Sequence, residues 1–120
     1  MKILIADDSE PIVASLKKLI STGKKKVIVS AAYTINDAIV ELRDNTPDLL
    51  ILDIMFPEGN GLELLYEARN FPQVKIIIIL TNFPYERLKS KSFAMGADYF
   101  FDKSNEFERV IEVINGFIQN

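Results

Sequence analysis

Short apolar runs alternate with amphipathic segments along the whole chain. Each apolar run is bounded by charged or turn-forming residues, which is typical of buried β-strands. The predicted strands are Lys2–Ala6, Lys26–Ala32, Leu49–Leu52, Val74–Leu80 and Tyr99–Phe101. The segments between them carry apolar residues at helical spacing. These positions are Ile12, Leu16, Leu19 and Ile20; Ile35, Ala38, Ile39 and Leu42; Leu62, Leu65 and Ala68; Tyr85, Leu88 and Met95; and Phe107, Val110, Ile111, Ile114 and Phe117.

Residues that cap helices agree with this alternation. The predicted helix starts are Asp8 or Ser9 with Pro11 in the first turn, Thr34 with Asp37, and Ser104. Gly96 suits the C-terminal end of the fourth helix. We therefore expect five strand–helix units without a linker or repeat between them.

Two of the predicted strands, Leu49–Leu52 and Val74–Leu80, are apolar on both faces. This pattern is typical of strands in a parallel sheet with helices on both sides. The expected architecture is an α/β fold, a doubly wound sheet of five parallel strands in one domain spanning residues 1–120. Ligands of such sheets bind at the carboxyl ends of the strands, near the switch point. The strand order 2-1-3-4-5 does not follow from periodicity alone.

Composition narrows the class of protein. The 120-residue chain is 48% hydrophobic and 26% charged, as expected of a single globular domain with its own core. The chain contains neither cysteine nor histidine. Disulfides, thiolate or histidine metal sites, and a histidine phosphodonor within this chain are therefore excluded, and a reducing, cytoplasmic location is favoured.

The charge distribution bears on possible partners. A net charge of −3 gives no basic footprint for nucleic acid, and we interpret the basic run Lys24–Lys26 as a solvated turn. The longest apolar run, Ile76–Leu80, is too short to span a bilayer. We expect a soluble protein that binds neither nucleic acid nor a membrane directly.

Polar and charged residues follow four of the strands. Asp7 and Asp8 follow the first strand, Asp53 the third, Thr81 the fourth and Lys103 the fifth. In the order 2-1-3-4-5, the three carboxylates converge at the switch point. Adjacent carboxylates after an apolar strand cost free energy unless a cation compensates them, and Mg²⁺ prefers such oxygen ligands. Lys103 and Thr81 then supply donors for a dianionic tetrahedral group.

The strand-end stretches "ADDSE", "LDIMFPEGNG", "ILTN" and "MGADYFFDKS" occur in this order. Together with the five-unit alternation, they resemble the receiver domain of two-component response regulators, which has a CheY-like, flavodoxin-like fold. The resemblance covers the whole chain, which ends one helix after Lys103. It implies a stand-alone signalling domain that is not an enzyme beyond its own phosphoryl transfer and hydrolysis.

The resemblance implies how the acidic residues work. Asp53 would attack a phosphohistidine donor and become an acyl phosphate. Asp8 would bind Mg²⁺ directly, and Asp7 would help to hold it, largely through water. Asp53 and the main-chain carbonyl of Met55 would complete the protein ligands.

The resemblance also implies roles for the remaining strand-end residues. Lys103 would pair with a phosphoryl oxygen, and Thr81 would swing its hydroxyl to another. Phe100, three residues before Lys103, occupies the position of the switch aromatic, but it has no hydroxyl to hydrogen-bond. The implied partners are a sensor histidine kinase or phosphotransfer protein and a downstream protein target. Val113 and Ile118 widen the last apolar stripe, which favours a dimer or partner surface formed by the fourth helix, fifth strand and fifth helix.

Three positions depart from the usual receiver pattern. Ser104 follows Lys103 where proline is common, Asn82 is larger than the small residue usual after Thr81, and Met55 also flanks the expected phosphoryl site. These departures support an alternative, a receiver-like interaction module that is not phosphorylated. Taken alone, each strand-end residue is also explained as a cap, a turn residue or a solvated side chain.

Two enzyme classes share the predicted fold class. A flavodoxin-like flavin carrier needs a loop rich in hydroxyls and glycine after the first strand, and the charges of "DDSE" would repel its phosphate. A dehalogenase-type phosphatase needs Asp-x-Asp spacing in the same loop, which "DDS" lacks. Both are weaker interpretations than the receiver domain.

Overall fold

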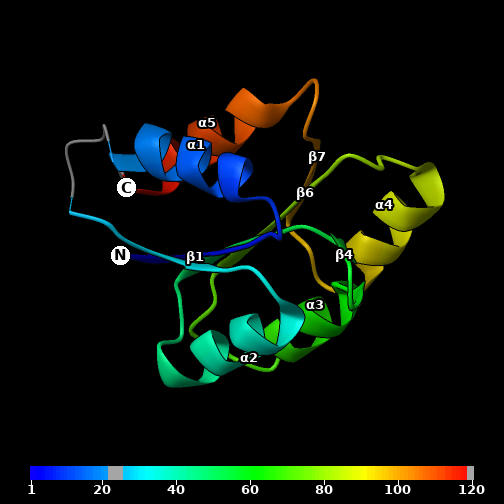
Figure 1. Cartoon of the computed structure of the whole chain (residues 1–120), viewed down its shortest axis with the longest axis horizontal. Coiled ribbons are helices and arrows are strands. Elements are labelled where there is room, and N and C mark those ends of the chain that lie inside the picture. Colours follow the sequence, from blue (N-terminus) through cyan, green and yellow to red (C-terminus); the bar gives the residue numbers. More distant parts are fainter. Residues whose placement is uncertain (22–25, 119–120) are drawn as a thin grey trace.

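The computed structural model describes residues 1–21 and 26–118, and the strands of its main sheet are all parallel. These strands are β1 (Lys2–Ala6), β2 (Ile28–Ala32), β3 (Leu49–Leu52), β6 (Ile76–Thr81) and β7 (Tyr99–Asp102). Their order is β2-β1-β3-β6-β7. When only the strands of the main sheet are numbered in chain order, this order is 2-1-3-4-5. The predicted doubly wound fold is therefore confirmed (Figure 1).

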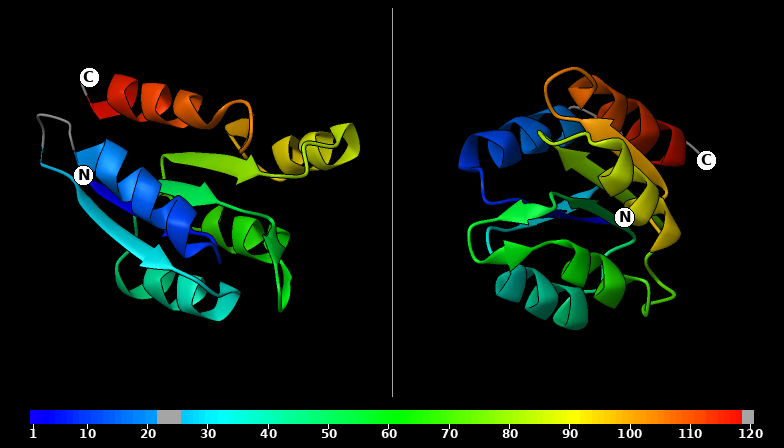
Figure 2. Two further views of the ribbon diagram at one scale, coloured as in Figure 1. Left: turned by 45° about the horizontal axis from the view of Figure 1, so that its top comes forward. Right: turned by 90° about the vertical axis from the view of Figure 1, so that its right-hand side faces the viewer.

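Helices cover both faces of the sheet (Figure 2). One face carries α1 (Glu10–Ser21) and α5 (Phe107–Ile118), and the other carries α2 (Ile35–Asp44) and α3 (Leu62–Ala68). The remaining helix, α4 (Glu86–Ala94), packs against the edge strand β7. Among the described residues, none of these helices has the length and apolar character needed to cross a membrane.

The central strand β3 explains why the core has two halves. Leu50 and Leu52 belong to the cluster under α2 and α3, whereas Leu49 and Ile51 belong to the cluster under α1 and α5. All four side chains are at most 2% exposed. The continuous apolar run therefore marks a strand buried on both faces, as predicted.

Several predicted helix boundaries are confirmed by hydrogen bonds. The Ser9 Oγ accepts the N–H of Ile12 at 3.4 Å, and the Thr34 Oγ1 accepts the N–H of Asp37 at 3.1 Å. Gly96 lies just after α4 with φ +108°, a left-handed conformation that glycine adopts without a Cβ penalty. Lys24 and Lys25 of the predicted basic turn lie outside the described residues.

The predicted start of the last helix at Ser104 is wrong, because α5 begins at Phe107. The side chain of Asp102 organises a turn instead, and its Oδ1 accepts the N–H of Ser104 at 2.9 Å. The Glu106 Oε1 accepts the Asp102 N–H at 3.1 Å and closes the turn. Local side-chain bonds of this kind compete with the helix and delay its start.

The segment after β3 forms a small hairpin whose strands the sequence analysis did not predict. Its strands, β4 (Met55–Phe56) and β5 (Gly59–Asn60), pair antiparallel. Two-residue strands carry no periodicity, so the pattern of apolar residues could not reveal them. The predicted strand bounds differ elsewhere by two residues at most: β2 begins at Ile28, and β6 begins at Ile76 and includes Thr81.

The two residues that widened the last apolar stripe do not form a separate exposed surface. Val113 and Ile118 are partly buried and pack against the core cluster under α1 and α5. They therefore belong to the margin of the core, and their exposure gives no support to the predicted dimer surface.

Candidate functional site

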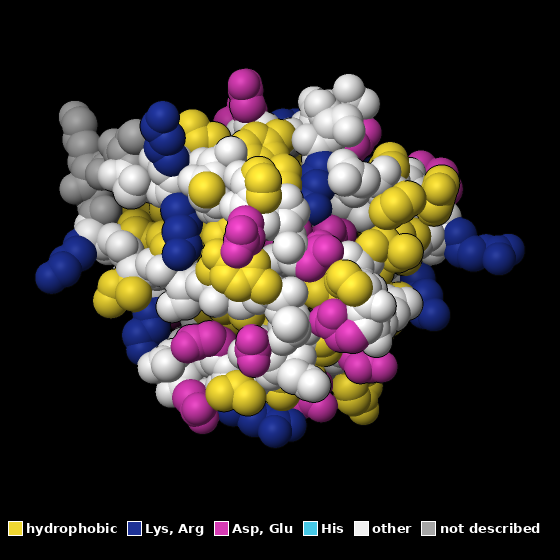
Figure 3. Space-filling model, viewed as in Figure 1, with side chains coloured by type: hydrophobic (Ala, Val, Ile, Leu, Met, Phe, Trp, Pro, Cys, Tyr) yellow, Lys and Arg dark blue, Asp and Glu magenta, His cyan; other side chains and the backbone are white. Residues whose placement is uncertain are grey.

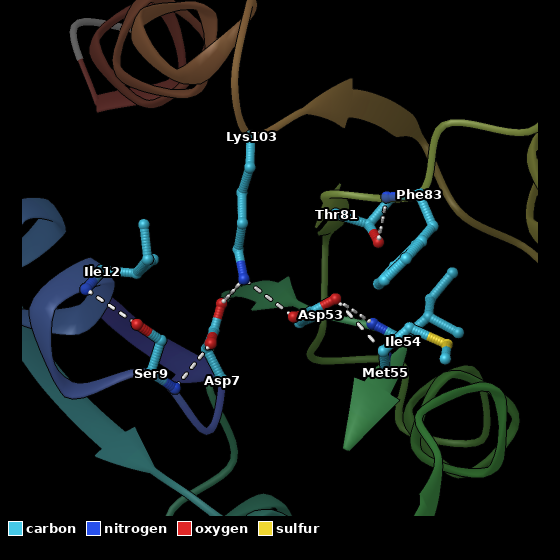
Figure 4. A network of polar contacts seen from close by, with 9 residues as sticks. All are labelled: Asp7, Ser9, Ile12, Asp53, Ile54, Met55, Thr81, Phe83 and Lys103. Atoms are coloured by element: carbon cyan, nitrogen blue, oxygen red, sulfur yellow. Dashed lines mark hydrogen bonds and ion pairs between the residues drawn. The ribbon is translucent and has the colours of Figure 1, made fainter. Parts of the chain in front are cut away.

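The polar residues that follow the strands meet at one edge of the sheet because the backbone pairing continues past each strand. The N–H of Asp7 donates to Ala32 O at 3.1 Å, and the N–H of Asp53 donates to Ala6 O at 2.9 Å. The N–H of Lys103 donates to Thr81 O, also at 2.9 Å. Continued pairing fixes the direction of each side chain, so the three charged groups point toward one another (Figure 4).

A buried lysine bridges the two buried carboxylates. The Lys103 Nζ lies 2.7 Å from Asp7 Oδ2 and 2.8 Å from Asp53 Oδ2. The three residues are 8%, 3% and 6% exposed, respectively. The sequence analysis expected a cation beside these carboxylates. The Lys103 ammonium supplies at least part of this positive charge.

Backbone N–H groups hold the other oxygen of each carboxylate. The Asp53 Oδ1 accepts the N–H of Ile54 at 2.7 Å and that of Met55 at 3.3 Å. The Asp7 Oδ1 accepts the N–H of Ser9 at 2.8 Å. Both carboxylates are therefore oriented before any ligand binds.

The pKa values of Asp7 and Lys103 are both raised. Burial raises the pKa of the Asp7 carboxyl above its usual value, although the hydrogen bond from Lys103 opposes this effect. Burial alone would lower the pKa of the Lys103 ammonium, but the hydrogen bonds to Asp53 and Asp7 outweigh it and raise the pKa. The raised pKa of Lys103 keeps this lysine charged at neutral pH.

The third predicted carboxylate lies at the solvent side of the cluster. Asp8 is exposed, and one oxygen from each of Asp7, Asp8 and Asp53 lies within 4.8 Å of the others. Three carboxylate oxygens are a donor set that suits a hard divalent cation such as Mg²⁺. The contact that Met55 makes here is through its N–H, and the role of its carbonyl as a metal ligand stays a prediction.

The hydroxyl side of the site is arranged differently. Thr81 is fully buried at the end of β6, and its Oγ1 accepts the N–H of Phe83 at 3.2 Å. The ring of Phe83 is 38% exposed and extends toward Ile54 and Met55 (Figure 4). The sequence analysis did not single out Phe83; its signal was an aromatic residue in the polar loop "TNFPY" directly after a strand.

The loop after Asp53 depends on a glycine. The Gly61 N–H donates to Ile54 O at 2.6 Å, and a Cβ at this position would lie 2.4 Å from the Asp53 carbonyl oxygen. The same loop is tied to α2, because the Glu58 Oε1 accepts the N–H of Ile35 at 2.8 Å. The sequence analysis did not predict the hydrogen bond between Ile35 and Glu58.

Comparison with known proteins assigns the chain to a family. The family model described as the response regulator receiver domain matches residues 3–115. The chain belongs to the receiver domain family. The chain is also 26% identical over 117 residues to the sensory transduction protein LytT of Bacillus anthracis, a match that covers 98% of this chain and 47% of LytT. It thus spans about half the length of this curated relative.

Solved structures support the fold of this receiver domain. A signal receiver domain of a DNA-binding response regulator from Colwellia psychrerythraea 34H has a TM-score of 0.89 at 23% identity, covering 100% of this chain and 99% of that one. A CheY-like receiver domain protein from Methanospirillum hungatei JF-1 has a TM-score of 0.87 at 24% identity, covering 98% and 93%. At these identities, the likeness establishes the fold.

Within this receiver domain, the predicted site residues fall into two groups. Asp7, Asp8, Asp53 and Lys103 come together in one charged cluster. Phe100 lies apart from it, 6% exposed, in the core cluster against which α4 packs. The predicted charged site is therefore assembled by the fold, whereas the switch role of Phe100 stays a prediction.

Proposed function

We propose that residues 1–120 act as one phosphoaccepting receiver domain, in which Asp53 takes a phosphoryl group from a phosphohistidine of a partner protein. The observation that carries this proposal is the set of groups around Asp53. Its Oδ2 contacts the Lys103 ammonium at 2.8 Å, its Oδ1 accepts two backbone N–H groups, and the carboxylates of Asp7 and Asp8 lie beside it. A carboxylate oriented in this way is a competent nucleophile toward phosphorus.

The reaction exchanges one bond to phosphorus for another. One carboxylate oxygen of Asp53 forms a bond to phosphorus while the bond between phosphorus and the imidazole nitrogen of the donor breaks. The electron pair of the broken bond stays on that nitrogen, and the product is an acyl phosphate. Phosphoryl transfer of this kind depends mainly on alignment and charge neutralisation, which the buried site supports.

Lys103 is the residue best placed to neutralise charge on the incoming group. Its ammonium already lies 2.8 Å from Asp53 Oδ2, so a phosphoryl oxygen attached at that carboxylate falls within its reach. Because the hydrogen bonds that it donates to both carboxylates raise its pKa, the lysine is a cation at neutral pH. A charge-assisted hydrogen bond to a phosphoryl oxygen is stronger than a neutral one.

The acidic cluster fits the predicted Mg²⁺ by its donor chemistry. Asp7, Asp8 and Asp53 offer three carboxylate oxygens, and the carbonyl of Met55 is the fourth predicted ligand. A divalent cation held by these carboxylates would offset their repulsion of an incoming phosphoryl group. Asp8 is exposed and Asp7 is buried, so the two residues would hold the ion from the solvent side and the protein side.

The signal would then pass from Asp53 through Thr81. The added group carries up to about two negative charges at neutral pH. It would draw the Thr81 hydroxyl away from the Phe83 N–H that it now accepts, and thereby change the β6–α4 loop. In this proposal Phe100 responds by a change in burial, and the output is a contact with a downstream protein in the cytoplasm.

The test is the intact mass of the purified protein after incubation with acetyl phosphate, with and without Mg²⁺. We expect one added phosphoryl group that requires Mg²⁺ and is absent from Asp53→Asn. Asp44→Asn is the matched control, because Asp44 is an exposed aspartate at the end of α2. This variant should be phosphorylated like the wild type.

Either of two results would contradict the proposal. Normal phosphorylation of Asp53→Asn would show that another residue is the phosphoacceptor. No adduct on the wild type, together with undetectable Mg²⁺ binding, would favour the alternative of a receiver-like interaction module that is not phosphorylated.

A further inference from the structure

A groove of about 620 Å³ lies beside the charged site, between the β4–β5 hairpin, the β6–α4 loop and α4. Its apolar wall includes Met55, Phe83, Tyr85 and the half-buried Leu88. Figure 3 shows hydrophobic side chains gathered over the β6–α4 loop and α4, with both basic and acidic side chains at the margin of this patch. The groove shares α4 with the surface of α4, β7 and α5 that the sequence analysis considered for dimers, but none of its lining residues lies on β7 or α5.

The apolar wall of this groove is unusually accessible for large side chains. Tyr85 is 64% exposed, Met55 49% and Phe83 38%. The rings of Phe83 and Tyr85 lie 6.1 Å apart between centroids at a tilt of 41°. A contiguous apolar hollow with two aromatic side chains is typical of a surface that binds a ligand or a partner chain.

The charges around the groove indicate what kind of chain it accepts. Arg87 and Lys91, four residues apart on α4, both line it, and such spacing places them on the same side of the helix. Both are exposed, and neither makes an ion pair with any residue that the structure describes. The described lining of the groove contains no carboxylate, so its charge is uniformly positive.

The neighbouring surface shows where this positive end stops. A second hollow shares Lys91 with the groove and continues along α3, where it is lined by Glu63 and Glu67. The surface is therefore aromatic and basic in the groove near Phe83 and Tyr85, and it becomes acidic in the second hollow along α3. A second copy of this chain related by a two-fold axis would bring Arg87 and Lys91 against themselves, which disfavours self-association through this groove.

We propose that the groove docks an acidic amphipathic segment of a partner protein. Aliphatic or aromatic side chains of the segment would pack against Phe83 and Tyr85, while its carboxylates would face Arg87 and Lys91. Docking of this kind does not require a phosphoryl group on Asp53, so it can be tested on the unmodified protein. The docked segment would touch Met55 and Phe83, whose N–H groups donate to Asp53 and Thr81.

The test begins with a library of random linear peptides displayed on phage and selected against the full wild-type chain. Selected peptides should be enriched in Asp and Glu flanking an aliphatic or aromatic residue. Amide chemical shifts of the labelled protein should then change along the hairpin, the β6–α4 loop and α4 when a selected peptide is added. This mapping is done on the wild type, so it does not depend on any variant folding.

Charge reversal supplies the quantitative arm of the test. The double variant Arg87→Glu/Lys91→Glu should weaken the affinity of the selected peptide by at least about tenfold, because like charges then face each other. Lys17→Glu/Lys18→Glu is the matched control, because it makes the same change in net charge at exposed positions of α1. Its affinity should stay within about twofold of the wild type.

Several results would overturn the proposal. These are a selection that yields no binders, peptides without acidic enrichment, shift changes confined to another surface, or equal effects of the two double variants. Analytical ultracentrifugation of the protein without peptide tests whether a second copy of the chain occupies the groove instead. A dimer that is lost in Arg87→Glu/Lys91→Glu but kept in the α1 control would assign the groove to a second copy instead.

Discussion

The two sides of the receiver site are built in contrasting ways. On the carboxylate side, Asp7, Asp53 and Lys103 are each less than a tenth exposed, and every carboxylate oxygen of the buried pair has a partner. On the hydroxyl side, Thr81 is buried, but the loop that follows it is exposed from Asn82 to Tyr85. Among the described residues, only one side chain hydrogen-bonds to the backbone of this loop: Thr81 Oγ1 accepts the N–H of Phe83.

This contrast separates two tasks of the site. In the proposed function, the nucleophile and its neutralising lysine must be oriented before the phosphoryl group arrives, because catalysis by positioning depends on groups that need no rearrangement. A signal, in contrast, requires a part of the molecule with two accessible arrangements. The loop after β6 is exposed, so fewer packed contacts oppose such a change there than in the buried charge cluster.

The largest effect is expected from Lys103→Met, which removes the cation between two buried carboxylates. Leaving one or both of them unpaired should cost about 3 kcal/mol in the free energy of unfolding at neutral pH. Urea unfolding measures this difference. Lys75→Met is the control, because Lys75 is exposed, and it should stay within about 0.5 kcal/mol of the wild type. Equal stability of the two variants would mean that the carboxylate side is not held by its lysine.

The same pair of proteins gives a pH dependence with a defined sign. The pKa of Lys103 is raised in the folded state above its ordinary value of 10.5, so its contribution to stability is complete below pH 10.5. The contribution is lost as the pH rises through the folded pKa. The stability difference between the wild type and Lys103→Met should therefore narrow above pH 10.5.

The next effect in size concerns the backbone on the carboxylate side. The Cβ introduced by Gly61→Ala would lie 2.4 Å from Asp53 O and 2.9 Å from Ile54 Cα, so the acceptor loop must shift. We expect a loss of about 2 kcal/mol in stability, measured by urea unfolding, and slower phosphorylation by acetyl phosphate. Gly116→Ala in α5 is the matched control, because nothing lies within 4 Å of its Cβ. It should stabilise the protein by about 0.5 kcal/mol.

A smaller effect with the opposite sign is expected for Asp7→Asn. Because burial raises the pKa of Asp7 in the folded state above 3.8, the unfolded chain loses this proton first, and the wild type loses stability as the pH rises above 3.8. The asparagine variant lacks this loss. It should gain stability relative to the wild type between pH 3 and pH 7, while Mg²⁺ binding weakens. A constant difference across this range would contradict the assigned shift.

The smallest effect on stability is expected on the hydroxyl side. Thr81→Val removes the acceptor of the Phe83 N–H, but water can replace it because Phe83 is partly exposed, so the cost should be about 0.5 kcal/mol. Hydrogen exchange of individual amides sharpens the comparison. The Phe83 amide should exchange faster in this variant, and the Met55 amide, which donates to Asp53, should not change. Faster exchange at both amides would show that the two sides are not independent.

Most of the fold was predictable because it follows from burial. The apolar runs at Leu49–Leu52 and Ile76–Leu80 lie inside a sheet covered on both faces, and caps such as Thr34 act within a few residues. The errors occurred where short-range polar bonds decide the conformation. Asp102 delays the start of α5 beyond Ser104, and the hairpin after Asp53 rests on pairings too short to leave a pattern.

The members of the charged cluster were predictable, but their contacts were not. Position at the strand ends identified Asp7, Asp53 and Lys103, because parallel strands end at one edge. The sequence did not show that the lysine bridges both carboxylates, since this depends on side-chain reach across β1, β3 and β7. Nor did it reveal Phe83, because only the folded loop brings its N–H to Thr81 and its ring toward Met55.

The most direct test of the central claim is to locate the phosphoryl group among the three clustered carboxylates. The protein is phosphorylated with acetyl phosphate and Mg²⁺ and then treated with sodium borohydride, which reduces an acyl phosphate to the alcohol. Digestion and tandem mass spectrometry then identify the reduced residue. We predict homoserine at position 53 and unmodified aspartate at positions 7 and 8. Homoserine at position 7 or 8, with Asp53 intact, would contradict the assignment of Asp53 as the phosphoacceptor.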